Sequence, residues 1–440
     1  MGRIALIVLL SLGLAGCSSS LNPFKAKPPE RLKGERISVM LANPDLDPDP
    51  AVADLQVVLP PPKANESWPQ PGGSASHMMG HPALGNAPKR VWSVSIGAGS
   101  NRRRRLLAAP VVADGTVFAM DAENKVSAFD AKSGGQIWSL ELQSKEEDGG
   151  DLGGGLAYDG GRLYVTTGFA MVIALDAKTG KEIWRQSAGA PMRAGPTVAG
   201  GTVFALTVDN RLVALRAEDG REIWHHAGLT EVASILGGAS PAVDGDIVIV
   251  PNSSGELFAL RTDNGRPLWS ETLAAIRRID AVSQLADIRG DPVIEGGLVF
   301  AMSHSGRMVA VNARTGGRIW DKQIGGIQTP WLAGDYLFAI NSDGMVFALL
   351  KSSGRIRWVR QLQRYEDPED KKGPIIWAGP VLVGDRLIVA GSQGEALSIS
   401  PYTGKILGRL ELPDNVLIAP IVANRTLYFL TDDAELLAYR

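Results

Sequence analysis

Cysteine is nearly absent from this 440-residue chain, which has only Cys17. A disulfide framework, a Cys-x-x-Cys redox site and a multi-cysteine metal site are therefore excluded. An excess of basic charge is also absent, because 45 lysines and arginines stand against 47 acidic residues and give a net charge of −2. General affinity for nucleic acid needs a strongly basic surface and is not expected.

Long apolar runs are lacking beyond the N-terminus, so no internal membrane helix is predicted. The Gly-x-Ser-x-Gly, His-Glu-x-x-His and Gly-Lys-Ser/Thr signatures of common catalytic sites do not occur either. His77 and His81 have the i, i+4 spacing of helical metal ligands, but Gly80 and Pro82 disfavour a helix. We therefore predict no catalytic, cofactor-binding or metal-binding residues, and no cofactor.

The N-terminus has the pattern of a secretion signal over residues 1–16. Arg3 precedes an almost wholly apolar run, and small residues follow. The sequence Leu-Ala-Gly-Cys ending at Cys17 resembles a lipobox, so we expect cleavage before Cys17 and lipid attachment to it. Acyl chains on Cys17 would anchor the protein to a membrane. In lipoproteins of this type Asp after the cysteine retains the protein in the inner membrane, so Ser18 indicates the outer membrane, facing the periplasm.

Prolines are frequent between residues 17 and 66, and large apolar side chains are few. Proline-rich chain is extended and semi-rigid. We therefore predict a lipidated tether over 17–66 and a folded domain over 67–440.

Two sequence frames recur through the folded domain. The first is a small residue, Pro and Val, followed by Gly and an apolar run, and it has eight starts roughly 40–50 residues apart. The second is Ala-Leu-x-Ala-x-Thr/Ser-Gly-x-x-Trp, or close variants of it. Its tryptophans are Trp138, Trp184, Trp224, Trp269, Trp320 and Trp358. The seventh copy has Gly408 instead of Trp, and the eighth stops at Arg440 before the turn.

Each repeat is typical of four short strands joined by tight turns, without any long helical period. Units of this kind predict an all-β, eight-bladed β-propeller of four-stranded blades. The eighth unit lacks an outer strand, and the segment around Trp92 can supply it, so an N-terminal strand is expected to complete the last blade. The tryptophans are interpreted as docking residues between blades rather than as a cofactor stack.

The repeats resemble those of pyrroloquinoline-quinone dehydrogenases. With the lipobox, the chain length and eight blades, the whole resembles the BamB family of outer-membrane lipoproteins in the β-barrel assembly machinery. Segments 232–241 and 279–292 carry the closest likeness. The resemblance implies a non-enzymatic scaffold that binds the periplasmic domains of BamA and assists the insertion of outer-membrane proteins.

The family's contact surface has apolar residues in the first segment and acidic residues in the second. Carried over to this chain, the partner-binding residues are Ala233, Ile235, Leu236, Asp287 and Arg289. Leu236 stands where the family has a basic residue, and Arg289 where it has an acidic one. The two segments precede adjacent blades, so we expect them side by side, with Ile235 and Leu236 as an exposed aliphatic pair and Asp287 and Arg289 as its polar rim.

Two alternatives remain open. One is an envelope propeller lipoprotein with another binding role, such as glycan binding or a different complex. The other is a quinone-dependent dehydrogenase, which resembles the chain in fold but needs Ca²⁺ ligands and a catalytic Asp in the central funnel. Many such enzymes also have a disulfide of adjacent cysteines, which a chain with Cys17 alone does not have.

Overall fold

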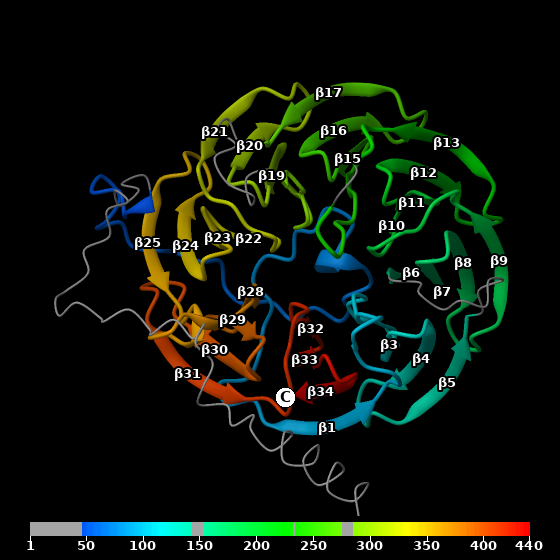
Figure 1. Cartoon of the computed structure of the whole chain (residues 1–440), viewed down its shortest axis with the longest axis horizontal. Coiled ribbons are helices and arrows are strands. Elements are labelled where there is room, and N and C mark those ends of the chain that lie inside the picture. Colours follow the sequence, from blue (N-terminus) through cyan, green and yellow to red (C-terminus); the bar gives the residue numbers. More distant parts are fainter. Residues whose placement is uncertain (1–45, 143–152, 232–233, 275–284) are drawn as a thin grey trace, which may run out of the picture. The chain divides into compact units, whose positions relative to one another are not determined.

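The computed structural model describes residues 46–142, 153–231, 234–274 and 285–440. Over these residues the strands form eight four-stranded sheets and one two-stranded hairpin. The four-stranded sheets are the blades of a ring, with the first strand of each blade nearest the centre (Figure 1). This arrangement confirms the predicted eight-bladed propeller. The one helical element among the described residues is the short 3₁₀ turn η2 (Pro71–Gly73).

The first four blades follow one another in chain order. Blade 1 contains β2 (Val111–Ala113), β3 (Thr116–Met120), β4 (Lys125–Asp130) and β5 (Gln136–Glu141). Blade 2 contains β6 (Gly154–Asp159), β7 (Arg162–Thr167), β8 (Met171–Asp176) and β9 (Glu182–Ser187). Blade 3 contains β10 (Thr197–Ala199), β11 (Thr202–Leu206), β12 (Arg211–Arg216) and β13 (Glu222–Ala227). Blade 4 contains β14 (Ala242–Asp244), β15 (Ile247–Pro251), β16 (Glu256–Arg261) and β17 (Pro267–Thr272).

The remaining blades include one insertion and the closing strand. Blade 5 contains β18 (Val293–Glu295), β19 (Leu298–Met302), β20 (Met308–Asn312) and β21 (Arg318–Lys322). Blade 6 contains β22 (Trp331–Ala333), β23 (Tyr336–Ile340), β24 (Met345–Leu350) and β25 (Ile356–Gln361), and the hairpin of β26 (Tyr365–Asp367) and β27 (Lys372–Pro374) follows it. Blade 7 contains β28 (Trp377–Val383), β29 (Arg386–Gly391), β30 (Glu395–Ile399) and β31 (Ile406–Glu411). Blade 8 contains β32 (Ile421–Ala423), β33 (Thr426–Leu430), β34 (Glu435–Tyr439) and β1 (Arg90–Ser95).

The middle strands are apolar on both faces because a neighbouring blade covers each face. Every residue of β15 and of β23 is buried. The outer strands face solvent and expose most of their residues, with a buried tryptophan in strands such as β9 and β13. Burial therefore falls from the inner and middle strands to the outer strand of a blade.

Strand β1 closes the ring by pairing antiparallel with β34 (Figure 1). Trp92 lies opposite Ala438, and Lys89 and Arg440 exchange backbone hydrogen bonds of 2.9 and 3.0 Å. The first and last strands of the propeller therefore share one sheet. This arrangement covers the edge of β34, which would otherwise be open to pairing with another chain.

Seven tryptophans dock the outer strand of one blade onto the next blade. Each indole Nε1–H donates to a backbone carbonyl at 2.8–3.3 Å, in the pairs Trp92–Ala131, Trp138–Ala177, Trp184–Ala217, Trp224–Thr262, Trp269–Ala313, Trp320–Lys351 and Trp358–Pro401. The ring also lies against the turn glycine of that blade. A Cβ at Gly220 would lie 2.5 Å from the Trp184 ring, and Gly220 has φ +75°, so the turn needs glycine on both grounds. The interpretation of these residues as docking groups is confirmed.

Residues 46–66, which the sequence assigns to the tether, lie against the propeller. The Asp49 amide donates to the Ile356 carbonyl at 2.8 Å, and Arg357 Nε donates to the Leu55 carbonyl at 2.6 Å. Proline content does not predict where the docked part of the chain begins, because an extended chain can dock through its backbone without a regular apolar pattern. The predicted residues 1–16, Cys17 and the tether up to residue 45 lie outside the described residues.

Residues 65–82, here called the central segment, cross the middle of the ring (Figure 1). They hydrogen-bond to the first strand of every blade, or to the turn that follows it, at 2.6–2.9 Å. The paired residues, from blade 1 to blade 8, are Trp68–Val112, Pro69–Tyr158, Gln70–Val198, Ala75–Val243, Ser76–Ile294, Gly80–Trp331, Pro82–Gly384 and Asn65–Asn424. The central segment therefore fills one end of the central channel.

Candidate functional site

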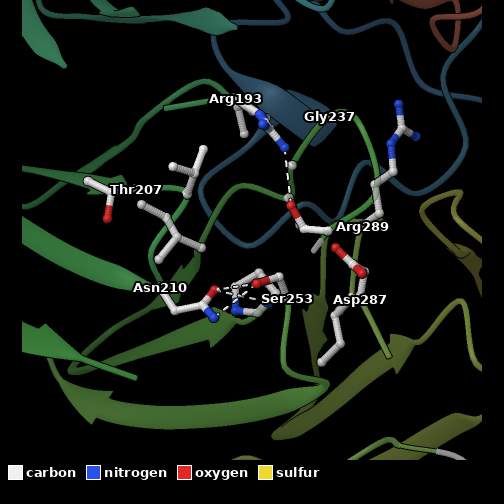
Figure 2. Close-up of a pocket in the computed structure, with 15 residues that line it drawn as sticks. Arg193, Thr207, Asn210, Gly237, Ser253, Asp287 and Arg289 are labelled. Carbon is white, nitrogen blue, oxygen red and sulfur yellow. Dashed lines mark hydrogen bonds between the residues drawn. The ribbon is translucent and has the colours of Figure 1, made fainter. Parts of the chain in front are cut away.

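The described parts of the two predicted partner-binding segments, 234–241 and 285–292, lie side by side where they precede blades 4 and 5 (Figure 2). Residues 279–284 of the second segment lie outside the described residues. The Ile235 amide donates to Asp287 Oδ1 at 3.0 Å, and Arg289 Nε donates to the Leu236 carbonyl at 2.8 Å. The second segment thus holds the backbone of the first at two successive residues. Ala233 lies outside the described residues.

Asp287 is not a rim residue, because its side chain is buried and the residue is only 5% exposed. One carboxylate oxygen accepts from Ile235, while Oδ2 has no hydrogen-bond partner in the described part of the chain. Burial raises the pKa of this carboxyl above its ordinary value, and the hydrogen bond from the Ile235 amide opposes that rise. Asp287 therefore supports the loop from beneath instead of flanking a contact patch.

Arg289 packs closely under a glycine of the neighbouring loop. Gly237 has φ +99°, and a Cβ there would lie 2.5 Å from Arg289 Nε. Burial lowers the pKa of the Arg289 guanidinium below its ordinary value, while the carboxylates of Asp291 and Asp287 act in the opposite direction. The place of Arg289 in the loop depends on glycine at position 237.

The predicted aliphatic pair is divided between the surface and the interior. Leu236 is 38% exposed, whereas Ile235 is half-buried. Only Leu236 therefore presents a largely free apolar side chain on this loop.

A small pocket of about 40 Å³ lies beside these loops, between blades 3 and 4 (Figure 2). On its floor Asn210 binds Ser253, since Asn210 Oδ1 accepts from the Ser253 amide at 2.9 Å. Arg193 reaches over it and donates to Ser234 Oγ at 3.1 Å. These contacts fix the loops to the blades on either side.

A larger cavity of about 170 Å³ occupies the centre of the ring. Its walls are the first residues of several blades, and the central segment contributes Trp68, Pro71, Gly72 and His77. Arg193, Gly237, Gly238 and Arg289 line both this cavity and the smaller pocket. The predicted partner surface therefore borders the central cavity.

Sequence reasoning missed Arg193 and the tryptophans of the cavity. Arg193 lies in a linker with no motif around it, so no signal was available. Trp331 did give a signal, because it stands where the first repeat frame has Val or another small residue. Trp68 belongs to the stretch that holds Pro69 and Pro71, where no repeat pattern applies.

The two histidines at positions 77 and 81 contact different parts of the propeller. His77 Nδ1 lies 2.7 Å from the Pro292 carbonyl, and His81 Nε2 accepts from the Asp385 amide at 3.0 Å. Within the described ranges no three His, Cys, Asp or Glu residues are grouped so that they could hold a metal ion. In the same ranges, no helix has the length and apolar character needed to cross a membrane.

Eight four-stranded blades, with the repeated turn glycine in seven of them and a docking tryptophan on seven of the eight outer strands, define a β-propeller with pyrroloquinoline-quinone-like repeats. The family model described as outer membrane protein assembly factor BamB matches residues 86–142, 122–360 and 363–440, and the chain belongs to this family. BamB from Salmonella typhimurium is 26% identical over 356 residues, which cover 80% of this chain and 88% of the relative.

Two solved structures share the fold at low sequence identity. The crystal structure of BamB from Moraxella catarrhalis has a TM-score of 0.67 at 20% identity and covers 80% of this chain and 100% of that chain. A quinohemoprotein alcohol dehydrogenase from Comamonas testosteroni has a TM-score of 0.65 at 14% identity and covers 85% of this chain and 80% of that chain. At such identities these likenesses show the fold alone.

The lining of the central cavity does not fit the Ca²⁺ that the alternative enzyme class needs. Asp291 is its one carboxylate, and Ca²⁺ takes six to eight oxygen ligands.

Proposed function

We propose that the protein is a non-enzymatic scaffold of the outer-membrane protein assembly machinery, and that it binds the periplasmic domains of BamA. Membership of the BamB family supports the role in assembly. The main observation in support of this binding surface is the pair of loops, in which Asp287 and Arg289 hold the backbone of Ile235 and Leu236.

The loop is suited to binding because its conformation is fixed before a partner arrives. Two hydrogen bonds from the second segment and one from Arg193 to Ser234 restrain the first segment. A restrained loop loses little conformational entropy on association, so more of the contact energy is available for affinity. Leu236 is the exposed apolar side chain on this loop.

The experiment is capture of purified BamA periplasmic domains by the Leu236→Asp variant. A carboxylate buried without a partner in an apolar contact costs about 3–5 kcal/mol, so capture should fall at least a hundredfold. Leu268→Asp is the matched control, because Leu268 is 41% exposed on an outer strand and has the same side chain. Normal capture by a folded Leu236→Asp variant would contradict the proposed surface.

We further propose that residues 1–16 are a signal peptide and that a lipid on Cys17 anchors the protein to the outer membrane, facing the periplasm. Residues 17–45 would form the free part of the tether, since residues 46–66 dock on the propeller. Cys17→Ala should leave the propeller folded and move the protein to the soluble fraction. Fractionation with a circular dichroism control tests this proposal, and membrane retention of the variant would refute lipid as the sole anchor.

A further inference from the structure

The central cavity, which borders the predicted partner surface, has the features of a ligand site. Its volume is about 170 Å³, and a cavity of about 150 Å³ holds one benzene molecule. It reaches the surface, since Gly238 in its wall is exposed and Thr329 and Ile418 are half-buried. A single small molecule with one ring therefore has both the room and a way in.

One wall of the cavity is aromatic and flat. Trp68 from the central segment stacks on Trp331 from blade 6, with ring centroids 6.0 Å apart and planes inclined at 21°. Pro330, Leu417 and Ala419 continue the apolar lining. Such a surface favours the face of an aromatic ring or a short apolar chain.

A buried histidine of the central segment completes the lining of the cavity but offers no polar atom to a ligand. His77 is 5% exposed, and its Nδ1 lies 2.7 Å from the Pro292 carbonyl. Its Nε2 is itself buried and has no partner within the described residues, so a hydroxyl of a ligand in the cavity does not reach it.

Two guanidinium groups line the loop side of the cavity. Arg193 donates to Ser234 Oγ, and Arg289 donates to the carbonyls of Leu236 and Ile327. The remaining N–H groups of both side chains make no hydrogen bond within the described residues. The carboxylates of Asp291 and Asp287 act on Arg289, but neither lies within 4.0 Å of a guanidinium nitrogen in this part of the chain.

The view of the site shows how the two arginines are placed. Both side chains extend on the Gly237 side of the loops, away from the Asn210–Ser253 pair (Figure 2). Guanidinium groups bind carboxylates with paired, charge-assisted hydrogen bonds. The two groups are therefore in a position to hold an anion at the loop side of the cavity.

We propose that the central cavity binds a small organic monoanion, namely a carboxylate carried on a single apolar ring. Arg193 and Arg289 bind the carboxylate, and the ring lies against the Trp68–Trp331 wall. The two arginines also hold the loop proposed to bind BamA, so a variant at the apolar wall separates the two proposals.

The first test is calorimetric titration of the full protein with two probes. Benzoate carries the carboxylate and the ring, and benzamide has the same ring without the charge. We expect one-to-one binding of benzoate and binding of the amide about tenfold or more weaker. Equal affinity for the carboxylate and the amide, or no binding of benzoate at about 10 mM, would overturn the proposal.

Variants then assign the contacts. Arg193→Gln should weaken binding of benzoate about tenfold or more and leave binding of the amide unchanged. Ser234→Ala is the matched control, because it removes the contact of Arg193 but keeps the guanidinium, and it should bind as the original chain does. Unchanged binding of benzoate by a folded Arg193→Gln variant would contradict the proposal.

A last variant tests the location without touching any polar group. Ala419→Phe fills the cavity from its apolar wall and should abolish binding of both probes. A melting curve shows whether the variant is folded, and Arg193→Gln decides the question if it is not. Retained binding by folded Ala419→Phe would place the ligand elsewhere and contradict the proposal. Ala419→Phe leaves Arg193 and Arg289 in place, so it should capture BamA domains normally, and the two proposals can fail independently.

Discussion

Seven of the eight blade interfaces are held by an indole, whereas the interface between blades 7 and 8 has none. The strand β31 carries Gly408 where the other outer strands have tryptophan, and nothing lies within 4 Å of a Cβ at that position. The reason lies in the neighbouring blade. Its outer strand β1 comes from the N-terminus, so no turn with a glycine follows β34 for an indole to dock on. Blade 7 therefore lacks the tryptophan and blade 8 lacks the turn for the same reason, which is that the ring closes between β34 and β1.

The N-terminal chain supplies a different connection at this interface. Asn65 bonds to blade 8 through the Asn424 amide at 2.6 Å, and Pro82 bonds to blade 7 through the Gly384 amide at 2.9 Å. Lys63 joins the two stretches, because it exchanges backbone hydrogen bonds with His81 and Ala83 at 2.8 and 2.9 Å. The comparison indicates that a closed ring needs a connection at every interface, but that it need not be an indole.

Deletion of residues 67–94 should have the largest effect on the ring. It removes β1 with Trp92, most of the central segment and the contact of Pro82 with blade 7. Loss of one buried tryptophan alone costs about 3–5 kcal/mol, and an open edge on β34 is added to it. We expect loss of cooperative thermal unfolding, followed by circular dichroism. An unchanged midpoint would mean that the ring closes without this segment.

Trp184→Ala should have the next largest effect, with a destabilisation of about 3–5 kcal/mol. Trp184 is buried, packs on Gly220 and donates to the Ala217 carbonyl at 3.0 Å. Gly408→Trp is the complementary change at the interface without an indole. Because no turn receives the ring there, its effect should be within about 0.5 kcal/mol. Denaturant unfolding measures the free energy of unfolding of both variants. A clear gain in stability from Gly408→Trp would contradict the difference drawn here between this interface and the other seven.

Asn65→Ala should cost about 1–2 kcal/mol, less than the loss of an indole. The side chain donates to the Val422 carbonyl at 2.5 Å and to the Ser67 carbonyl at 3.1 Å. The backbone bond to Asn424 remains in the variant, so the connection is weakened and not removed. Asn86→Ala is a control from the same N-terminal chain, because Asn86 contributes only its backbone carbonyl to the Arg386 side chain. Equal midpoints for the two variants would contradict a role for the Asn65 side chain.

The ring could be predicted from the sequence because its information is local and repeated. The turn glycine and the tryptophan recur at fixed spacing, and the place of Trp92 before blade 1 was enough to predict the closing strand. The contacts of residues 46–82 could not be predicted. They use single backbone hydrogen bonds to many blades, and such bonds leave no side-chain pattern.

The loop site was predicted in position but not in the orientation of its groups. Segments 234–241 and 285–292 do lie together, as their places before adjacent blades indicate. Asp287 and Arg289 were expected at the surface because charged side chains usually are. Burial of Asp287 follows from its bond to Ile235, which joins residues 52 positions apart and has no signature in the sequence.

Asp287→Asn should have the smallest effect on stability. Asp287 lies on the side of the ring where the blade interfaces have indoles. Burial raises the folded-state pKa of Asp287 above the unfolded value of about 3.9, so the folded state favours the protonated carboxyl. The contribution of this group to stability is present at acid pH and is lost as pH rises through the folded-state pKa. Asparagine does not ionise and can still accept from the Ile235 amide through its oxygen. The variant should therefore melt slightly above the original protein at pH 7, and the difference should shrink towards pH 4. The contrary result would be a variant that is less stable than the original protein, by the same amount at pH 7 and at pH 4. That result would show that folding does not disfavour the ionised carboxylate of Asp287.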